Sequence, residues 1–286
     1  MLNTIDRVQL VVPDRTAAAK GWVALLGAEL ERDDKVSALA CRRAILRLGT
    51  GCVEILEPDG AGPVSQAVAE RGGHLFAGGA TTADVGVFAT RLRERGLEVP
   101  VEAGQAFLDP GATGNHGLRL VVSPDEPREP VGVVAALYEV TNLVADAPAV
   151  TADYSDLFGL DATSFEPISS SFYGYEGTLT LFDHRRLDRL EVITPQVPDN
   201  TMGRFFARFG ESLYMAFAES GDLELIEERA REAGAGYTAV PPEPARGTGA
   251  IQTIFLHPPA LGGMMLGLSR PTQAWQWSGK PERVEG

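Results

Sequence analysis

Short apolar runs, many of them rich in β-branched residues, recur along the chain and predict β-strands. They fall at residues 5–12, 42–48, 52–57, 117–122, 137–144, 177–182, 189–194, 251–256 and 264–268. Between these runs, segments with leucine, alanine and arginine at helical spacing end at glycines, namely Gly27, Gly96, Gly159 and Gly234. The alternation of both patterns along the whole chain predicts an α+β fold.

The second half of the chain repeats the pattern of the first. Three pairs of segments resemble each other in the same order: 5–14 (IDRVQLVVPD) and 137–146 (LYEVTNLVAD), 52–58 (CVEILEP) and 189–195 (RLEVITP), and 84–96 and 222–234. The spacing between partners drifts only slowly, as loop insertions would cause, so we interpret the pattern as a duplication. In each half the pattern predicts a strand, a helix and three strands, and it predicts this order twice. We therefore expect four βαβββ modules that pair into two curved-sheet domains, with helices outside and a cleft on each concave face.

The domain boundaries follow from the composition. Residues 123–136 begin with prolines and charges, which favours an irregular connection. We predict an N-terminal domain over 1–124, a linker over 125–136, a C-terminal domain over 137–270 and a tail over 271–286. The tail is expected to pack across a surface instead of adding an element.

The composition also limits the partners. The chain has 286 residues with 25 basic and 39 acidic side chains, and the net charge of −14 argues against a nucleic-acid partner. No apolar run approaches the ~18–20 residues that span a bilayer, and the first residues lack the pattern of a signal peptide. We therefore predict a cytoplasmic protein without a membrane partner. Cys41 and Cys52 lie in apolar segments and are expected to be buried free thiols.

The repeated segments resemble a known superfamily, the vicinal oxygen chelate proteins, which include glyoxalase I, methylmalonyl-CoA epimerase, extradiol dioxygenases and bleomycin-resistance proteins. The resemblance rests on IDRVQLVVPD with LLG, CVEILEP, LRERGLEV, LDP with HGLRLVV, and their partners in the second half. It covers about residues 3–270, and the tandem arrangement is most similar to the two-domain dioxygenases. It implies the fold, whereas the reaction stays open because this fold carries several chemistries.

The resemblance implies four strand positions that usually hold a divalent metal. In the first half these positions carry Arg7, Glu54, Phe76 and Val121, of which only Glu54 can bind a metal. We expect the first half to be metal-free, with Arg7 and Glu54 facing each other across neighbouring strands. Either the two form a buried ion pair, or Arg7 binds an anionic group of a ligand.

In the second half the same positions carry Glu139, Glu191, Tyr214 and Gly267. No histidine is among them, so the two-histidine, one-carboxylate iron site of a ring-cleaving dioxygenase is not expected. Two close carboxylates without a metal repel each other, which raises one pKa and provides a candidate general acid or base. Tyr214 is a candidate hydrogen-bond donor to an enolate or carbonyl oxygen. We predict Glu139, Glu191 and Tyr214 as catalytic residues.

A structural role for these residues is the alternative. Glu191 would then pair with Arg189 or Arg204, and Tyr214 would be a packed aromatic residue. The four histidines, His74, His116, His184 and His257, are expected in loops or turns, with His257 bordering the cleft.

Further ligand-binding residues are predicted around the cleft of the second half. Residues 200–209 (NTMGRFFARF) mix phenylalanine with arginine at helical spacing, which is typical of core packing or of a lid whose arginine meets a carboxylate or phosphate. The complete set of predicted ligand-binding residues is Arg7, Glu54, Arg204, Phe205, Tyr173, His257 and Met265.

Three functions are compatible with these observations. The favoured one is a metal-independent isomerase or lyase of the glyoxalase or epimerase type, which binds an apolar oxygenated small molecule and needs no cofactor. The second is a protein that binds a drug-like or aromatic compound without turnover. The third is a dioxygenase- or epimerase-type enzyme with a divalent metal on Glu139 and Glu191. A homodimer is compatible with each of them.

Overall fold

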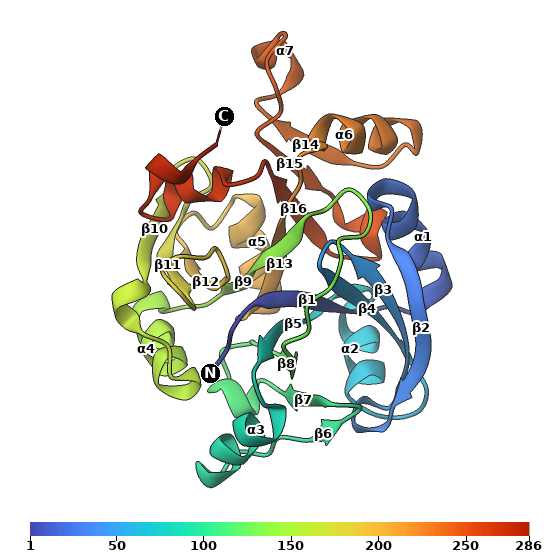
Figure 1. Ribbon diagram of the computed structural model, residues 1–286, viewed down its shortest axis with the longest axis vertical. Coiled ribbons are helices and arrows are strands. Elements are labelled where there is room, and N and C mark those ends of the chain that lie inside the picture. Colours follow the sequence, from blue (N-terminus) through green and yellow to red (C-terminus); the bar gives the residue numbers. More distant parts are fainter. Residues whose placement is uncertain (286) are drawn as a thin grey trace.

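The computed structural model describes residues 1–285 and contains two eight-stranded curved sheets, one in each half of the chain (Figure 1). The N-terminal sheet has the order β2-β3-β4-β1-β5-β8-β7-β6, and the C-terminal sheet has the order β10-β11-β12-β9-β13-β16-β15-β14. The strands are β1 (Ile5–Val11), β2 (Glu29–Val36), β3 (Cys41–Leu48), β4 (Gly51–Pro58), β5 (His74–Thr82), β6 (Val101–Glu102), β7 (Gln105–Leu108), β8 (Leu120–Pro124), β9 (Ala136–Leu143), β10 (Glu166–Ser170), β11 (Tyr175–Leu181), β12 (Arg189–Pro195), β13 (Ser212–Glu219), β14 (Tyr237–Val240), β15 (Thr253–Leu256) and β16 (Met265–Ser269).

The strand pairing confirms the four predicted modules. In the first half β1 pairs with β4 in parallel and with β5 antiparallel, so two βαβββ units join through their first strands. In the second half β9 makes the same two kinds of pairs with β12 and β13. The predicted α+β fold with two curved sheets is confirmed.

The helices cover the outer faces of the sheets, and one further helix follows the first module of each half. They are α1 (Arg15–Leu26), α2 (Pro63–Arg71), α3 (Val85–Glu94), α4 (Ala147–Phe158), α5 (Thr201–Phe209), α6 (Leu223–Glu232) and the short α7 (Glu243–Arg246). The repeated sequence explains the ends of α1 and α4. Asp14 and Asp146 accept hydrogen bonds from backbone amides of the first turn, and Gly27 and Gly159 end the helices in left-handed conformation, with φ of 70° and 66°.

The apolar pattern did not predict the edge strands β2, β6, β10 and β14, nor the inner strands β5, β7 and β13. Strand β2 has the sequence ELERDDKV and is exposed over most of its length. Charged side chains on an edge strand prevent pairing with other chains, and they also remove the apolar alternation by which a strand is recognised. The strands predicted from apolar runs are all present, with boundaries within three residues.

The two domains share one continuous hydrophobic core. This core contains strand residues of both sheets whose side chains point toward the helices, among them Leu10 and Val140. Backbone of the two domains also meets directly, since a Cβ added to Gly263 would lie 1.9 Å from the carbonyl oxygen of Gly73. This contact leaves no room for a side chain and holds the beginning of β5 against the C-terminal domain.

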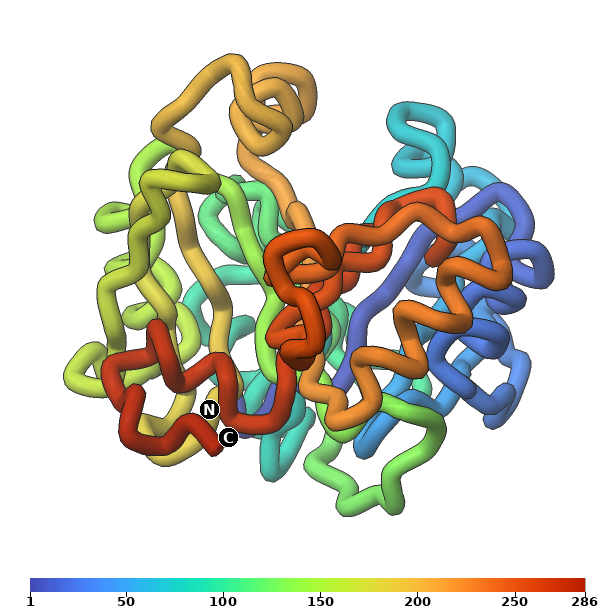
Figure 2. Tube along the Cα trace, turned by 90° about the horizontal axis from the view of Figure 1, so that it is seen from above, coloured from blue at the N-terminus to red at the C-terminus, as the bar shows by residue number. Residues whose placement is uncertain are grey.

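The tail lies along the C-terminal domain (Figure 2). Its 3₁₀ turns η5 (Gln273–Trp277) and η6 (Pro281–Arg283) follow β16, and Trp275 is buried in the cluster on the concave face. Ser278 accepts a hydrogen bond of 2.8 Å from the buried Arg189. The tail therefore packs into one end of the concave face, deeper than a surface contact.

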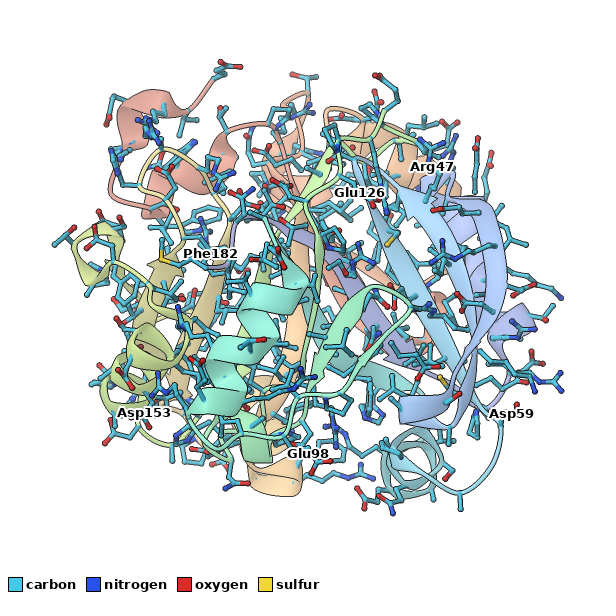
Figure 3. All side chains as sticks on the ribbon, turned by 60° about the horizontal axis from the view of Figure 1, so that its bottom comes forward. Arg47, Asp59, Glu98, Glu126, Asp153 and Phe182 are labelled. Atoms are coloured by element: carbon cyan, nitrogen blue, oxygen red, sulfur yellow. The ribbon has the colours of Figure 1, made fainter. Side chains whose placement is uncertain are left out.

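Charged side chains lie mostly around the outside of the molecule, and Figure 3 shows Asp59, Glu98 and Asp153 at its periphery. No helix within residues 1–285 has both the length and the apolar character needed to cross a membrane.

Candidate functional site

The concave face of the N-terminal domain is closed by a polar network around Glu54. Its carboxylate accepts hydrogen bonds from Arg7 (2.8 Å), Gln9 (2.7 Å), Gln105 (2.7 Å) and Arg43 (3.1 Å). All five side chains are buried. Because a carboxylate offers about four acceptor sites, these partners satisfy Glu54 completely.

The network sets the charge of Glu54. Burial alone raises the pKa of this carboxyl, but Arg7, Arg43 and the two amides outweigh burial and lower the pKa to about 2. The structure thus places Arg7 and Glu54 in a buried ion pair, and neither of them faces the large cleft described next. A smaller cavity of about 270 Å³ borders this network at Gln9.

The concave face of the C-terminal domain is open. It contains a cleft of about 800 Å³, and its walls carry the side chains of Tyr175, Phe205, Tyr214, Phe217, Phe255 and Met265. This volume lies in the range of small-molecule sites, and the aromatic walls suit an apolar ligand. Phe172 is 86% exposed at the same cleft and packs edge-on against Tyr173, with ring centroids 4.9 Å apart.

A carboxyl group lies in this apolar surrounding. Glu191 on β12 is 5% exposed, lines the cleft, and accepts a hydrogen bond of 2.6 Å from the hydroxyl of Thr141 on β9. Burial and then the negative charge of Glu139 raise its pKa well above the ordinary range of a glutamate. Glu191 therefore favours the neutral acid form more strongly than an ordinary glutamate does, and in that form it can donate a hydrogen bond to a ligand oxygen.

Glu139 has a different environment. Arg189 Nε lies 2.5 Å from Glu139 Oε2, and both side chains are buried. Arg189 also donates to Ser278 of the tail. Glu139 is outside the lining of the cleft, so its charge acts on Glu191 from behind the cleft surface.

The structure places most of the predicted site residues in this one cleft. Besides Glu191, the lining includes Tyr214, Phe205, Tyr173, His257 and Met265. The rings of Phe205 and Tyr214 meet edge to face at 4.9 Å, and His257 Nε2 is 2.9 Å from the hydroxyl of Thr238. Arg204 lies elsewhere, because its side chain is exposed and donates to the backbone oxygen of Asp199.

The N-terminal domain contributes residues that sequence reasoning missed. Arg71 at the end of α2 and His74 and Leu75 at the beginning of β5 line the cleft of the other domain. The expectation that His74 lies in a loop was wrong, since it is a buried strand residue. No pattern in the sequence shows that residues of one domain reach the cleft of the other.

The hydrogen bond of His74 defines its state. Its Nδ1 is 2.9 Å from the carbonyl oxygen of Gly72, which can only accept. Burial lowers the pKa of the imidazole to about 4, against the hydrogen bond to Gly72. The ring is therefore neutral near pH 7, with the proton on Nδ1 and a lone pair on Nε2.

The divalent metal that the superfamily resemblance implies does not fit the four positions in the C-terminal domain. Glu139 is ion-paired with Arg189, and burial beside Glu139 raises the pKa of Glu191 and disfavours the carboxylate that a metal would need. Gly267 offers no ligand, and a Cβ there would lie 2.3 Å from the ring of Phe217, so this ring fills the space of a fourth ligand. Within residues 1–285, no group of three or more His, Cys, Asp or Glu side chains is arranged to hold a metal.

Comparisons with known proteins support the fold. No protein-family model matches the sequence, and a search of curated proteins gave no match. A triple variant of 4-hydroxymandelate synthase from Streptomyces coelicolor matches with a TM-score of 0.68 and 15% identity over 99% of both chains. Methylmalonyl-CoA epimerase from Mycobacterium tuberculosis matches with a TM-score of 0.40 and 22% identity over 49% of this chain and 89% of that chain.

The match to the synthase extends over both domains, and at this identity it shows the fold and not the reaction. The two-domain fold that this chain shares with the synthase is the one expected from the resemblance to the vicinal oxygen chelate proteins. This chain therefore has the vicinal oxygen chelate fold in its tandem, two-domain form.

Proposed function

We propose that the C-terminal domain binds an apolar, oxygenated small molecule and that Glu191 transfers a proton to its oxygen in a metal-independent isomerase- or lyase-type reaction. The observation that carries this proposal is the buried carboxyl of Glu191, with a raised pKa, in the wall of an aromatic cleft of about 800 Å³.

The cleft suits a carbonyl compound. Its aromatic walls suit the apolar part of such a ligand, and the acid form of Glu191 offers the carbonyl oxygen a hydrogen bond from a buried position. Thr141 donates to Glu191 Oε2 and thereby fixes the orientation of the carboxyl group. A hydrogen bond from an acid strengthens as negative charge develops on the carbonyl oxygen, which favours the enol form.

The proton balance needs a base as well as an acid. Glu191 gives its proton to the carbonyl oxygen, and the lone pair of His74 Nε2 takes the proton from the adjacent carbon. The enol returns to the ketone when the oxygen gives its proton back to Glu191 and the carbon is reprotonated. Both groups line the same cleft, and their pKa shifts favour the acid form of Glu191 and the neutral ring of His74.

Binding without turnover is the second candidate. It is favoured by the ion pair of Glu139 with Arg189, which leaves Glu191 without a second carboxylate as base, and by the low basicity of His74. The fold is also compatible with a divalent-metal enzyme. We prefer a metal-free reaction because Glu139 is paired with Arg189 and the raised pKa of Glu191 disfavours its carboxylate form.

Hydrogen exchange at carbon tests the proposal without knowledge of the natural substrate. Phenylacetone and 4-phenyl-2-butanone are incubated with the protein in D₂O, and exchange beside the carbonyl is followed by NMR. We expect catalysed exchange in the wild type and a loss of about 10²–10⁴-fold in Glu191→Gln, which keeps the shape of the neutral acid.

The exposed substitution Glu94→Gln serves as the control and should leave the exchange rate unchanged. Equal exchange in Glu191→Gln and wild type would contradict the proposed acid. Binding of both ketones without any exchange would favour the binding protein.

A further inference from the structure

Three arginines differ from all others in the described chain. Every other arginine of residues 1–285 forms an ion pair or a side-chain hydrogen bond within the protein. The exceptions are Arg71, Arg119 and Arg208. In a chain with 39 acidic and 25 basic side chains, carboxylates are the more abundant partners, so arginines without one are unexpected.

These arginines lie close together although they come from different domains. The guanidinium carbons of Arg71 and Arg208 are 4.2 Å and 4.9 Å from the ring centroid of the same residue, Phe209 at the end of α5. Arg71 and Arg119 both lie near enough to His74 to act on its charge. Of the three, Arg71 lines the cleft, whereas Arg208 is exposed on α5 and Arg119 borders the smaller cavity of the N-terminal domain. Arg71 and Arg208 thus mark the place where α2 of the N-terminal domain meets α5 of the C-terminal domain.

The arrangement leaves positive charge and hydrogen-bond donors unsatisfied. Arg71 Nε is buried without a hydrogen-bond partner among the described residues. Burial and then Arg208 lower the pKa of Arg71, which indicates that its cation lies in an unfavourable place when no anion is bound. Stacking on Phe209 fixes the plane of the guanidinium, and its N–H groups are left at the edges for another partner.

We propose that the ligand of the cleft carries an oxyanion, a carboxylate or a phosphate, which binds to Arg71 and Arg208 at the mouth between the domains while the apolar part extends toward Glu191. The inference rests on the proposed function, because it assumes the same cleft, and it adds the class of ligand: an apolar carbonyl compound with an acidic group at the opposite end.

This assignment gives the N-terminal domain a role. Its own concave face is closed around Glu54, yet the end of α2 supplies the anion-binding group for the neighbouring cleft. The close backbone contact between Gly73 and Gly263 keeps that end in place. A ligand held at both Arg71 and Glu191 would contact both domains.

Calorimetric titration with matched probes tests the inference. Phenylacetone, phenylacetate and phenyl phosphate share the phenyl group and differ in charge. We expect the anionic probes to bind more tightly than the ketone and to weaken with salt between about 25 and 200 mM, and the tighter of the two identifies carboxylate or phosphate.

Variants locate the anion. Arg71→Gln should weaken the anionic probes by roughly 10–100-fold and leave phenylacetone within about twofold, whereas Arg71→Lys should retain part of the affinity. Arg231→Gln removes an exposed arginine on α6 outside the cleft and should change neither. Thermal unfolding of each variant confirms that it is folded.

The outcomes separate this inference from the proposed function. Binding of phenylacetone with no preference for the anionic probes, or an equal loss for all three probes in Arg71→Gln, would overturn the inference and leave the apolar cleft intact. Arg71-dependent binding of anions without hydrogen exchange at carbon would support the inference and contradict the proposed catalysis. If none of the probes binds, the ligand site itself is disproved and the inference falls with it.

Discussion

Glu54 and Glu191 occupy equivalent positions in the two domains, yet their pKa values are shifted in opposite directions. Each lies on the strand that pairs in parallel with the first strand of its domain, and each is buried. The pKa of Glu54 is lowered to about 2, whereas that of Glu191 is raised well above its ordinary value. The fold therefore does not decide the charge of this carboxyl; the neighbouring side chains do.

The difference comes from where each domain places its arginine. In the N-terminal domain Arg7 stands on the first strand, opposite Cys52, and points its guanidinium at Glu54. In the C-terminal domain the arginine is on the other strand, as Arg189, opposite Glu139. Arg189 pairs with Glu139, so Glu191 has a second carboxylate nearby instead of a cation. The strand that carries this arginine thus separates the two sites, and Arg43 with the two amides completes the closed network of the N-terminal domain.

The largest expected effect comes from breaking the network in the N-terminal domain. Glu54→Ala leaves two buried cations, Arg7 and Arg43, without their common partner, and should lower the free energy of unfolding by about 3–5 kcal/mol. Urea denaturation at pH 7 measures it. The exposed Glu94→Ala should stay within about 0.5 kcal/mol of the wild type. A loss below about 1 kcal/mol for Glu54→Ala would show that the network does not stabilise the domain.

The next effect is that Glu54 and Glu191 change the stability of the protein with pH in opposite directions. Glu54 has a folded pKa of about 2 against an ordinary value of 4.5, so its contribution to stability is present above about pH 4.5 and is lost as the pH falls toward 2. The pKa of Glu191 is raised, so its contribution is present below about pH 4.5 and is lost as the pH rises.

Unfolding free energies of Glu54→Gln and Glu191→Gln from pH 3 to 8 measure this difference. Relative to the wild type, Glu54→Gln should become less stable as the pH rises, and Glu191→Gln should become more stable. Parallel curves for both variants would mean that the two carboxyls have the same charge, against the contrast drawn here.

Duplication made the fold readable from sequence, because two weak patterns in the same order are stronger evidence than one. Asp14 caps the N-terminus of α1 and Gly27 its C-terminus. Asp146 and Gly159 cap the two ends of α4 in the same way. The exposed strand β2 was missed because its charged side chains face water on both sides.

The site was predictable only where its residues belong to the repeated strands. Glu191 and Tyr214 could be placed by comparison with the first half, and both line the cleft. Arg71 and His74 could not, because their position depends on how the two domains pack, which local spacing does not encode. Nor could the sequence show which of two neighbouring glutamates pairs with Arg189, since one residue along the strand decides it.

The smallest expected effect concerns metal, and it tests both domains at once. Glu54 already has all its acceptor sites occupied, and Glu191 must lose a proton before it can bind a cation beside Arg189. Millimolar Mn²⁺ or Fe²⁺ at pH 7 should therefore raise the Tm by less than about 1 °C, because stabilisation follows binding to the folded state. Glu191→Gln should behave like the wild type.

One contradicting outcome is a rise of several degrees that disappears in Glu191→Gln, together with stoichiometric metal in protein purified without chelator. It would show that the two glutamates of the C-terminal domain form a metal site and that the metal displaces any proton on Glu191. A rise that disappears only in Glu54→Gln would place the metal in the closed domain and contradict the comparison from the other side.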